Sequence, residues 1–367
     1  MNLDVGRALV GGHLVRGSVV VDDHRVTEVG AAPGRLDRVA IPGFVDLQIN
    51  GFGGVDFRTA GADGLMETAA AITSTGTTYL LPTFYSSTID GYIEALIALG
   101  EAHDRGTGLG ARLGGAHLEG PFLSRTWAGA HDPQRLISPD TVALHRLLGA
   151  GPIALMTLAP ELPDAFDLIS RLRHAGVVVS MGHSDADAAV TRDAAEAGVA
   201  MLTHCWNAHR RFAPRDPGPA AVALDRMFVG LICDRVHVAD DTLRLSFLAA
   251  AGRVCVVTDA VAPAGTDWST WDIDGVEVMV AGGRACLRDG TLAGSVVTMD
   301  QSVRNLVDIG IAPEVALSAA STVPAAVIGV ADHDLRPGSK ADVAILDDDF
   351  EVVETIIGGR VVWRRDD

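Results

Sequence analysis

Residues 177–209 read VVVSMGHSDADAAVTRDAAEAGVAMLTHCWNAH, and this stretch decides the fold because it predicts a strand, a helix and a second strand in succession. The three valines at its start are typical of a buried strand. Ser184 and Asp185 can cap a helix that runs to about Ala197, and Gly198 ends that helix. The apolar residues after Gly198 begin the second strand. The stretch therefore predicts one β-α-β unit.

A histidine stands at the end of each of these two strands, His183 in MGHS and His204 in LTHCW. In a parallel sheet with right-handed crossovers, both side chains emerge at the carboxyl ends of adjacent strands, where barrel enzymes place their active sites. Two imidazoles from neighbouring strands indicate a metal site. Either histidine alone is as consistent with a hydrogen-bonded structural residue as with a metal ligand. The metal-site interpretation therefore needs a carboxylate as a further ligand.

Strand and helix patterns alternate through the middle of the chain. Eight strand segments occur in order: VDLQIN, TTYLLPTFY, LGGAHLEG, IALMTLAPE, VVVSMGH, AMLTHCWNA, FVGLICD and VCVVTDA. Eight strands with helical sequence between them indicate a (β/α)8 TIM-like barrel, which commonly takes about 250 residues. Within the 367 residues we predict this barrel over residues 42–334. Short β-rich runs make up residues 1–41 and 335–367, and we expect both ends to pair into one small β-sandwich domain.

The composition is that of a protein with a large apolar core, since hydrophobic residues make up 48% of the chain and the mean hydropathy is +0.26. The formal net charge of -18 argues against nucleic acids and anionic membranes as partners, because both need a basic surface. No run approaches the ~18 apolar residues of a membrane span, and the first residues lack a signal-peptide pattern, so we predict a cytoplasmic protein. The four cysteines have no CxxC spacing, which gives no indication of a zinc ribbon or a disulfide framework.

Side chains suited to catalysis stand at the ends of the predicted strands. Glu119 in HLEGPF supplies a carboxylate beside His183 and His204, and one oxygen with two nitrogens is a common catalytic zinc shell that leaves a position open for water. Asp259 in VTDA can accept a proton from that water and return it to the leaving group. These four residues predict hydrolysis of an amide or ester. The alternatives are an internal salt-bridge network for the trio and a helix cap for Asp259.

Three more polar residues lie on the same strands. His117 lies two residues before Glu119 and therefore shares its strand face, so it is a metal ligand on geometry alone, or it orients Glu119 or packs below it. Gln48 and Asn50 alternate along the first strand, so their side chains share a face. We predict that this pair binds substrate or supports the ligands from behind. The alternative is that both amides satisfy backbone groups of a loop.

Seven motifs occur in order along nearly the whole chain: PGFVDLQINGFGGVDF, HLEGPF, GAH at residues 129–131, MGHSDA, THCWNA, VTDAVAPAG and LAGSVVTMDQSVRNLV. This set resembles the N-acetylglucosamine-6-phosphate deacetylases, a family of the amidohydrolase superfamily. The resemblance implies hydrolysis of N-acetyl-D-glucosamine 6-phosphate to D-glucosamine 6-phosphate and acetate, in amino-sugar catabolism. It implies that Glu119, His183 and His204 bind a catalytic divalent metal and that Asp259 is the general acid and base.

The first strand bears on the number of metals. Many members of the superfamily have the pattern HxH there and hold a second metal, whereas this chain has Gln48 and Asn50, as does a one-metal branch of the deacetylases. The resemblance therefore implies one divalent metal ion per subunit. Zinc is the expected ion, and Fe²⁺, Mn²⁺ and Co²⁺ are alternatives.

The resemblance also assigns substrate-binding residues. His131, the histidine of GAH, is expected beside the sugar and its acetyl group. Asn207 and the backbone of Ala208 are expected near the phosphate, and His237 on the same side. Arg215 corresponds to an arginine that reaches the phosphate of a neighbouring subunit, so the resemblance implies a homodimer.

The chain departs from the family pattern around the substrate. Arg235 replaces a glycine in the segment that ends at His237, His209 follows the Asn-Ala pair with two arginines where a methionine is more typical, and Trp127 precedes GAH where basic residues are common. The extra arginines Arg235, Arg210 and Arg211 can strengthen an anion site or reshape it, or they are solvated surface charges. N-acetylgalactosamine 6-phosphate or another N-acyl amino sugar is therefore an alternative substrate. A non-catalytic sugar-phosphate sensor is a further alternative, against which all ligands and Asp259 are present.

Overall fold

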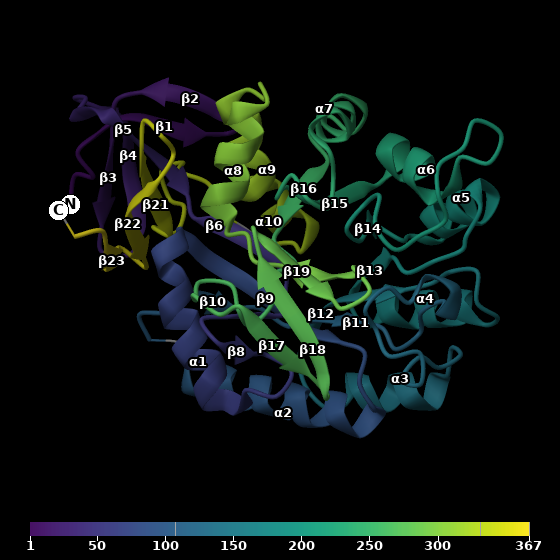
Figure 1. Cartoon of the computed structure of the whole chain (residues 1–367). Helices are drawn as coiled ribbons and strands as arrows, with labels where there is room; N and C mark the ends of the chain where they lie inside the picture. Colours follow the sequence, from purple (N-terminus) through teal and green to yellow (C-terminus); the bar gives the residue numbers. More distant parts are fainter. Residues whose placement is uncertain (107, 331, 367) are drawn as a thin grey trace.

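Eight strands, each predicted from an apolar run, pair in parallel in chain order. The structure is a computed structural model that describes residues 1–106, 108–330 and 332–366. β6 pairs with β9 at one side, and a parallel bridge between Ile49 and Ala260 brings β6 next to β16, so the sheet closes on itself. Figure 1 shows helices around this sheet. The (β/α)8 prediction is confirmed, with strands β6 (Phe44–Ile49), β9 (Thr77–Tyr85), β11 (Ala116–Glu119), β12 (Ile153–Leu158), β13 (Val178–Met181), β14 (Met201–Leu202), β15 (Phe228–Ile232) and β16 (Val254–Val257).

The helices between the strands bury one face each. In α2, Tyr92, Leu96 and Leu99 recur at helical spacing on the buried face, and the Thr88 side chain accepts the backbone N–H of Gly91 at the amino end. The outer helices are α1 (Gly61–Ala71), α2 (Ile89–Arg105), α3 (Thr141–Leu148), α4 (Ala165–His174), α5 (Ala188–Ala197), α6 (Gly218–Arg226), α7 (Asp240–Ala249), α8 (Met299–Asp308), α9 (Pro313–Ala320) and α10 (Thr322–Val327), with short 3-10 turns η1 (Ile72–Thr75) and η2 (Arg125–Trp127).

The predicted cap of α5 is wrong. The helix begins at Ala188, and the side chain of Asp187 accepts the backbone N–H groups of Ala189 and Val190 at 2.8 and 2.9 Å. Ser184 and Asp185 lie earlier, where the chain is still in the turn that follows β13. The carboxyl end is as predicted, because Gly198 adopts the left-handed conformation with φ of 97°.

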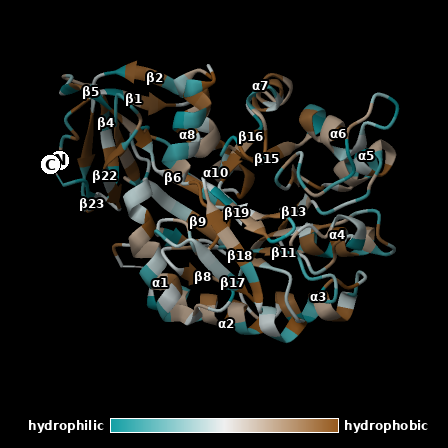
Figure 2. Ribbon diagram, in the orientation of Figure 1, coloured by the Kyte–Doolittle hydropathy of each residue, from teal (hydrophilic) through white to brown (hydrophobic). Residues whose placement is uncertain are grey.

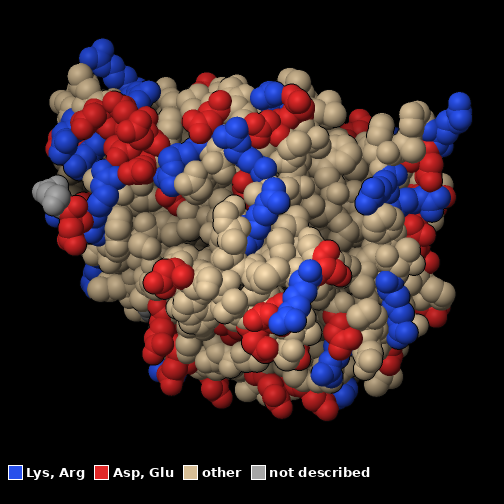
Figure 3. All heavy atoms as spheres, in the orientation of Figure 1, with Lys and Arg blue, Asp and Glu red and all other residues tan. Residues whose placement is uncertain are grey.

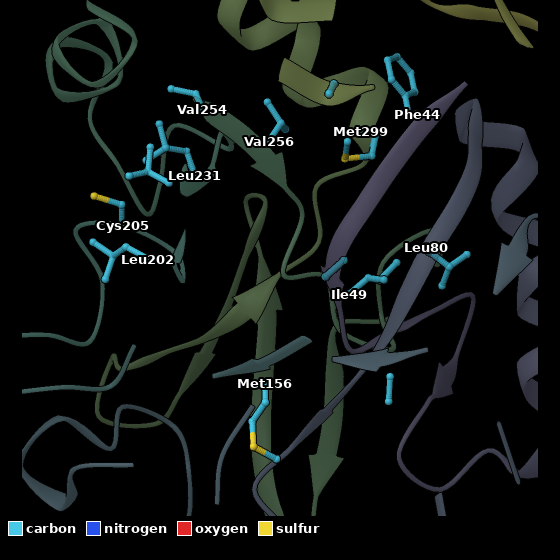
Figure 4. Packing of buried hydrophobic residues seen from close by; sticks show 14 of the residues in the cluster. Phe44, Ile49, Leu80, Met156, Leu202, Cys205, Leu231, Val254, Val256 and Met299 are labelled. Atoms are coloured by element: carbon cyan, nitrogen blue, oxygen red, sulfur yellow. The ribbon is translucent and has the colours of Figure 1, made fainter. Parts of the chain in front are cut away.

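Two apolar clusters, one on each face of the barrel sheet, explain why the sequences of the barrel strands are nearly continuous hydrophobic runs. Val254 and Val256 of β16 join the cluster beneath the outer helices, which Figure 4 shows from close by. Cys255 and Val257, at the alternate positions, join a second cluster inside the barrel with residues such as Leu47. Strands buried on both faces have apolar residues at most positions. Figure 2 accordingly shows β15 and β16 as largely hydrophobic and the outer helices in mixed colours.

The two ends of the chain form one β domain beside the barrel. In its six-stranded sheet, β5 of the amino-terminal part pairs antiparallel with β21 of the carboxyl-terminal part, and the two-stranded β3–β4 hairpin packs on the sheet through Val19, Val21 and Val343. The strands are β1 (Val5–Val10), β2 (His13–Arg16), β3 (Ser18–Asp22), β4 (Arg25–Ala31), β5 (Arg35–Pro42), β21 (Val343–Asp347), β22 (Val352–Ile357) and β23 (Arg360–Arg364). The prediction of a terminal β domain is confirmed; 42–334 remains our proposed extent of the barrel domain.

A four-stranded antiparallel sheet between β16 and α8 is absent from the sequence prediction. It consists of β17 (Thr270–Ile273), β18 (Val276–Ala281), β19 (Arg284–Leu287) and β20 (Leu292–Ser295). Three glycine-containing turns join its strands, at residues 274–275, 282–283 and 289–290. Smaller elements are the β7 (Gly51–Phe52) and β8 (Val55–Asp56) hairpin and β10 (Arg112–Leu113), which pairs with β9.

The charge of the surface and the length of the helices are relevant to binding of nucleic acids and membranes. On the face in Figure 3, basic and acidic side chains are interspersed, and that face shows no continuous basic patch. Among the described residues, no helix is long and apolar enough to cross a bilayer.

Candidate metal centre and substrate pocket

Three side chains from different strands converge at the carboxyl end of the barrel. The Oε1 atom of Glu119 lies 2.9 Å from Nε2 of His204 and 3.2 Å from Nε2 of His183, and the two Nε2 atoms lie 3.0 Å apart. All three residues are buried. The structure therefore brings together the three residues that the sequence proposes as metal ligands.

The chemistry of this trio fits a divalent cation. Nδ1 of His183 lies 2.8 Å from the carbonyl oxygen of Trp127, which can only accept, so Nδ1 holds the proton and Nε2 presents a lone pair to the centre. A zinc ion bound at ordinary tetrahedral distances holds such ligand atoms roughly 3.3 Å apart. The observed separations of 2.9–3.2 Å are close to that value. A buried carboxylate oxygen, the lone pair of His183 Nε2 and the neighbouring Nε2 of His204 form a donor set suited to a divalent cation.

The backbone at these strand ends explains how the side chains reach the centre. His183, His204 and Asp259 have φ angles of 46°, 30° and 48°, in the left-handed region that residues other than glycine rarely adopt. Each stands just after its strand, where the left-handed residue turns the chain away from the sheet. Such strained residues cluster at functional sites, where the surrounding structure holds them in place.

Asp259 is linked to the trio through the first barrel strand. Its Oδ1 atom accepts from Nδ2 of Asn50 at 2.7 Å and from Nε2 of Gln48 at 3.3 Å. The same Nε2 of Gln48 donates to Oε1 of Glu119 at 3.0 Å. Gln48 and Asn50 thus share one face, as predicted, and hold two carboxylates of the site in a fixed relation.

The two carboxylates have opposite pKa shifts. Burial and then the negative charge of Glu119 raise the pKa of Asp259 to about 6, against the opposing effect of nearby histidines and Asn50. Burial also disfavours ionised Glu119, but its close contacts with the Nε2 atoms of His183 and His204 outweigh burial and hold its pKa well below the usual value. One carboxylate is therefore suited to remain ionised as a ligand and the other to exchange a proton.

His117 lies below the site and does not belong to the trio. Its Nδ1 atom lies 3.0 Å from the backbone oxygen of Leu47 and its Nε2 atom 2.8 Å from the hydroxyl of Thr157. Both ring nitrogens are thus engaged inside the barrel. Burial lowers the pKa of His117 to about 4, so the ring is neutral. Of the alternatives predicted for this residue, packing below Glu119 agrees with the structure.

A pocket of about 320 Å³ opens above the trio. It includes most of the proposed substrate residues, and its polar lining includes Asn50, Glu119, His131, His183, His204, Asn207, His237 and Asp259, with Ala208 beside them. Its apolar wall includes Tyr85, Trp127, Ile232, Val261, Trp271, Ile273 and Leu292. Arg215 is exposed and does not line the pocket of its own chain.

Two histidines of the pocket have defined partners. His131 places its ring 4.4 Å from that of His183, and its Nδ1 atom lies 2.9 Å from the hydroxyl of Ser86. Burial lowers the pKa of His131 to about 3, so this ring is neutral. Nδ1 of His237 lies 2.6 Å from a carboxylate oxygen of Asp234, and both side chains are buried. That contact leaves Nε2 as the remaining hydrogen-bonding atom of His237.

Most residues that depart from the family pattern lie outside the pocket. Arg235 pairs with Asp240 at 2.7 Å, and Arg210 pairs with Asp216 at 2.7 Å. Of the alternatives for the extra arginines, surface charges agree with the structure for Arg235 and Arg210, because both guanidinium groups are held by surface carboxylates and neither lines the pocket of the same chain. Trp127 is the exception, since it lines the pocket.

His209 is a structural residue of the loop that follows His204. Its Nε2 atom accepts the backbone N–H of Trp206 at 2.8 Å, and its Nδ1 atom lies 3.1 Å from the backbone oxygen of Arg210. Both nitrogens are used by the neutral ring. Burial lowers the pKa of His209 to about 4.

This shift predicts a loss of stability in acid. An unfolded histidine has a pKa of about 6.5, so between pH 4 and 6.5 the unfolded chain binds the extra proton and the free energy of unfolding falls as the pH falls. From pH 7.5 to 5, wild type should lose about 2 kcal/mol more than a His209→Gln variant, which keeps an acceptor for Trp206 but does not titrate. Urea unfolding at the two pH values measures this difference. Equal losses in both proteins would contradict the assignment.

The pocket wall that the β17–β20 sheet contributes was not predicted from the sequence. Trp271, Ile273 and Leu292 come from this sheet and face the site across the pocket. The available signal was the alternation of apolar and polar residues over 270–281 with an Asp-Gly turn at 274–275. Tyr85 was also missed; its hydroxyl donates to Asp56 at 2.7 Å, and Arg58 donates to the same hydroxyl at 2.9 Å.

Comparisons with known proteins agree with this geometry, although no family model matches the chain. The N-acetylglucosamine-6-phosphate deacetylase of Homo sapiens is 35% identical to it, over 98% of this chain and 95% of the human protein. The protein of the same name from Bacillus subtilis is 34% identical, over 89% and 85% of the two chains.

Solved structures give the same result. A mutant N-acetyl-D-glucosamine-6-phosphate deacetylase from Mycobacterium smegmatis, in complex with N-acetyl-D-glucosamine-6-phosphate, matches with a TM-score of 0.92 and 31% identity over 99% of each chain. The N-acetylglucosamine-6-phosphate deacetylase from Thermotoga maritima matches with a TM-score of 0.92 and 28% identity over 100% of each chain. With relatives at 34–35% identity over most of their length, this chain belongs to the N-acetylglucosamine-6-phosphate deacetylase family of the amidohydrolase superfamily.

Proposed function

We propose that this protein is a metal-dependent deacetylase that hydrolyses N-acetyl-D-glucosamine 6-phosphate to D-glucosamine 6-phosphate and acetate in amino-sugar catabolism. The observation on which this rests is that the buried trio Glu119, His183 and His204 meets Asp259 in one pocket. The named activity of the family supports the substrate.

The trio would hold one divalent cation, for which we propose zinc, with Fe²⁺, Mn²⁺ and Co²⁺ as alternatives. When bound, this ion supplies Lewis-acid chemistry that polarises the amide carbonyl and makes water more acidic. Gln48 and Asn50 supply amides in place of further ligands, which supports a single ion. The donor Gln48 also keeps Glu119 oriented toward the two histidines.

Asp259 moves the proton in this proposal. Asn50 and Gln48 both donate to its Oδ1 atom, so we assign proton transfer to Oδ2. Oδ2 accepts the proton of the attacking water as the C–O bond forms at the acetyl carbonyl. Asp259 then returns this proton to the sugar nitrogen as the C–N bond breaks, which releases the amine and acetate. A carboxyl whose pKa is raised by burial is suited to both steps.

The phosphate needs a cation that the pocket of one chain lacks. Among the described residues that line the pocket there is no lysine or arginine. We propose that His237, Asn207 and the backbone of Ala208 bind the phosphate on one side and that Arg215 of a second subunit completes the site, so that the protein acts as a homodimer. The exposure of Arg215 supports this assignment. His131 would contact the acetyl group, because its ring lies against that of His183.

We further propose that the enzyme acts in the cytoplasm. All four cysteines are free, and Cys205, Cys233 and Cys255 are buried. Free thiols are usual in a reducing compartment, where disulfides are rare.

Replacing His237 with alanine tests the phosphate site. A hydrogen bond to a charged group is worth about 1.5–3 kcal/mol, so the variant should raise KM for the phosphorylated sugar about 10- to 150-fold. KM for unphosphorylated N-acetylglucosamine should change little. Steady-state kinetics with both sugars measure the split, with His174→Ala on the outer surface of α4 as a control. Equal changes for both sugars would remove His237 from the phosphate site.

The proposed function itself is tested by acetate release from the zinc-loaded protein. N-acetylglucosamine 6-phosphate, its unphosphorylated form and N-acetylgalactosamine 6-phosphate are compared at equal concentration. Preference for the first supports the proposal. Preference for the galactosamine isomer would leave the hydrolytic centre and change the substrate. Binding of a sugar phosphate without any acetate release would indicate a sensor.

A further inference from the structure

A short segment of chain covers the ring of His183. It begins at η2 and contains Trp127 and Gly129, both of which line the pocket. A Cβ atom placed on Gly129 would lie 3.4 Å from Cε1 of His183, which shows how closely the backbone approaches the ring. The backbone carbonyl oxygen of Trp127 accepts a hydrogen bond from Nδ1–H of His183 at 2.8 Å. The position of this segment therefore affects the orientation of a proposed metal ligand.

The indole of Trp127 is hydrogen-bonded to Asp185, which lies two residues after His183 in the chain. Its Nε1–H donates to Oδ1 of Asp185 at 2.8 Å. Trp127 thus contacts the turn after β13 twice, with its carbonyl at His183 and with its side chain at Asp185. The backbone N–H of Ser124 also donates to the backbone oxygen of His183 at 2.9 Å, which ties the start of the segment to the same turn.

Asp185 is itself fixed by its backbone. Its N–H donates to Oε1 of Glu161 at 2.6 Å, and its backbone oxygen accepts from the guanidinium of Arg210 at 3.3 Å. Ser184 donates to the second oxygen of Glu161 at 2.7 Å. The carboxylate of Asp185 is therefore presented to the indole by a turn that is held from two sides.

We propose that the Trp127–Asp185 hydrogen bond is a positioning device for the metal ligand His183. It keeps the carbonyl of Trp127 where that oxygen fixes the Nδ1–H tautomer, so that Nε2 faces Glu119 and His204. Trp127 and Asp185 are both positioning residues, because they act through His183. This inference rests on the proposed metal centre.

The test measures metal affinity apart from activity. Trp127→Phe keeps the carbonyl and an aromatic ring but removes the N–H, so the dissociation constant for zinc, from competition with a chelator, should rise about tenfold, the lower end of the range for partners behind the ligands. Asp185→Ala should have the same effect, and the visible spectrum of the Co²⁺ form should change in both. Asp185→Asn keeps an acceptor oxygen and should stay within twofold of wild type.

A double variant and a control separate this role from loss of folding. The double variant, Trp127→Phe with Asp185→Ala, should bind zinc no more weakly than the weaker-binding single variant, because both substitutions remove the same hydrogen bond. Trp268→Phe makes the same change at a half-exposed tryptophan that does not line the pocket, and should leave zinc affinity unchanged.

The outcomes distinguish the inference from the function on which it rests. If wild type binds no divalent metal, the proposed function fails. If wild type binds zinc and Trp127→Phe binds it equally well, the positioning role fails while the metal centre stands. A rise in KM for the sugar with zinc affinity and Co²⁺ spectrum unchanged would make Trp127 a wall of the pocket and overturn the inference.

Discussion

Replacing Asp259 with asparagine is expected to lower kcat for acetate release by about 10²–10⁴-fold, the range for loss of a general acid and base. Asparagine has nearly the same shape and still accepts from Asn50 through its carbonyl oxygen. It cannot take a proton from water or return one to the leaving nitrogen. The metal ligands Glu119, His183 and His204 are untouched, so the variant should bind one equivalent of zinc.

Kinetics and metal analysis on the same preparation test this expectation. Asp90→Asn is a matched control, because Asp90 lies at the exposed start of α2 in a surface pair with Arg146. The control should keep wild-type turnover. If Asp259→Asn with full zinc content kept more than about a tenth of wild-type kcat, general acid and base catalysis by Asp259 would be rejected.

Replacing His204 with alanine is expected to abolish turnover by removing the metal. Changes to partners behind a ligand cost about 10- to 100-fold in metal affinity, and loss of a ligand itself should exceed that range. The remaining His183 and Glu119 can supply only two of the three ligand atoms. Glu119 also loses one of the two contacts that hold its pKa low, so the buried carboxylate becomes less able to stay ionised.

Chelator treatment of wild type provides the companion measurement. Activity should fall with zinc content and return when zinc is added back, whereas zinc should not restore His204→Ala at concentrations that saturate wild type. His145→Ala, at an exposed position of α3, makes the same change away from the site. A His204→Ala protein that retains zinc and turnover would show that the trio is a hydrogen-bonded network and that the metal lies elsewhere.

Much of the site was predictable because it depends on local features of the chain. Glu119 ends its strand, and His183, His204 and Asp259 each follow theirs. In a parallel barrel the carboxyl ends of all strands meet at one end. Counting strands was therefore enough to bring these four residues together. The identity of the β-α-β unit at residues 177–209 depended on the same local periodicity.

Other features were not readable from the residues alone. In the sequence His209 was only a departure from the family pattern beside the Asn-Ala pair. The folded loop shows that both its nitrogens bond to backbone groups. The helix cap was predicted at Ser184 and Asp185 although the structure has it at Asp187, because several polar residues in succession can each cap a helix. The β17–β20 sheet was missed because short antiparallel strands after the eighth barrel strand have a weak pattern.

The sequence by itself determined the barrel, the terminal β domain and the set of residues able to bind a metal, because strand periodicity and the residue at each strand end are properties of short segments. Only the tertiary structure decided how these residues act on one another. Gln48 contacts Glu119 and Asp259 at sequence separations of 71 and 211 residues, and Trp127 contacts Asp185 at a separation of 58. Such contacts depend on barrel closure and loop packing, which bring distant segments within hydrogen-bond distance and select one rotamer and one tautomer for each side chain.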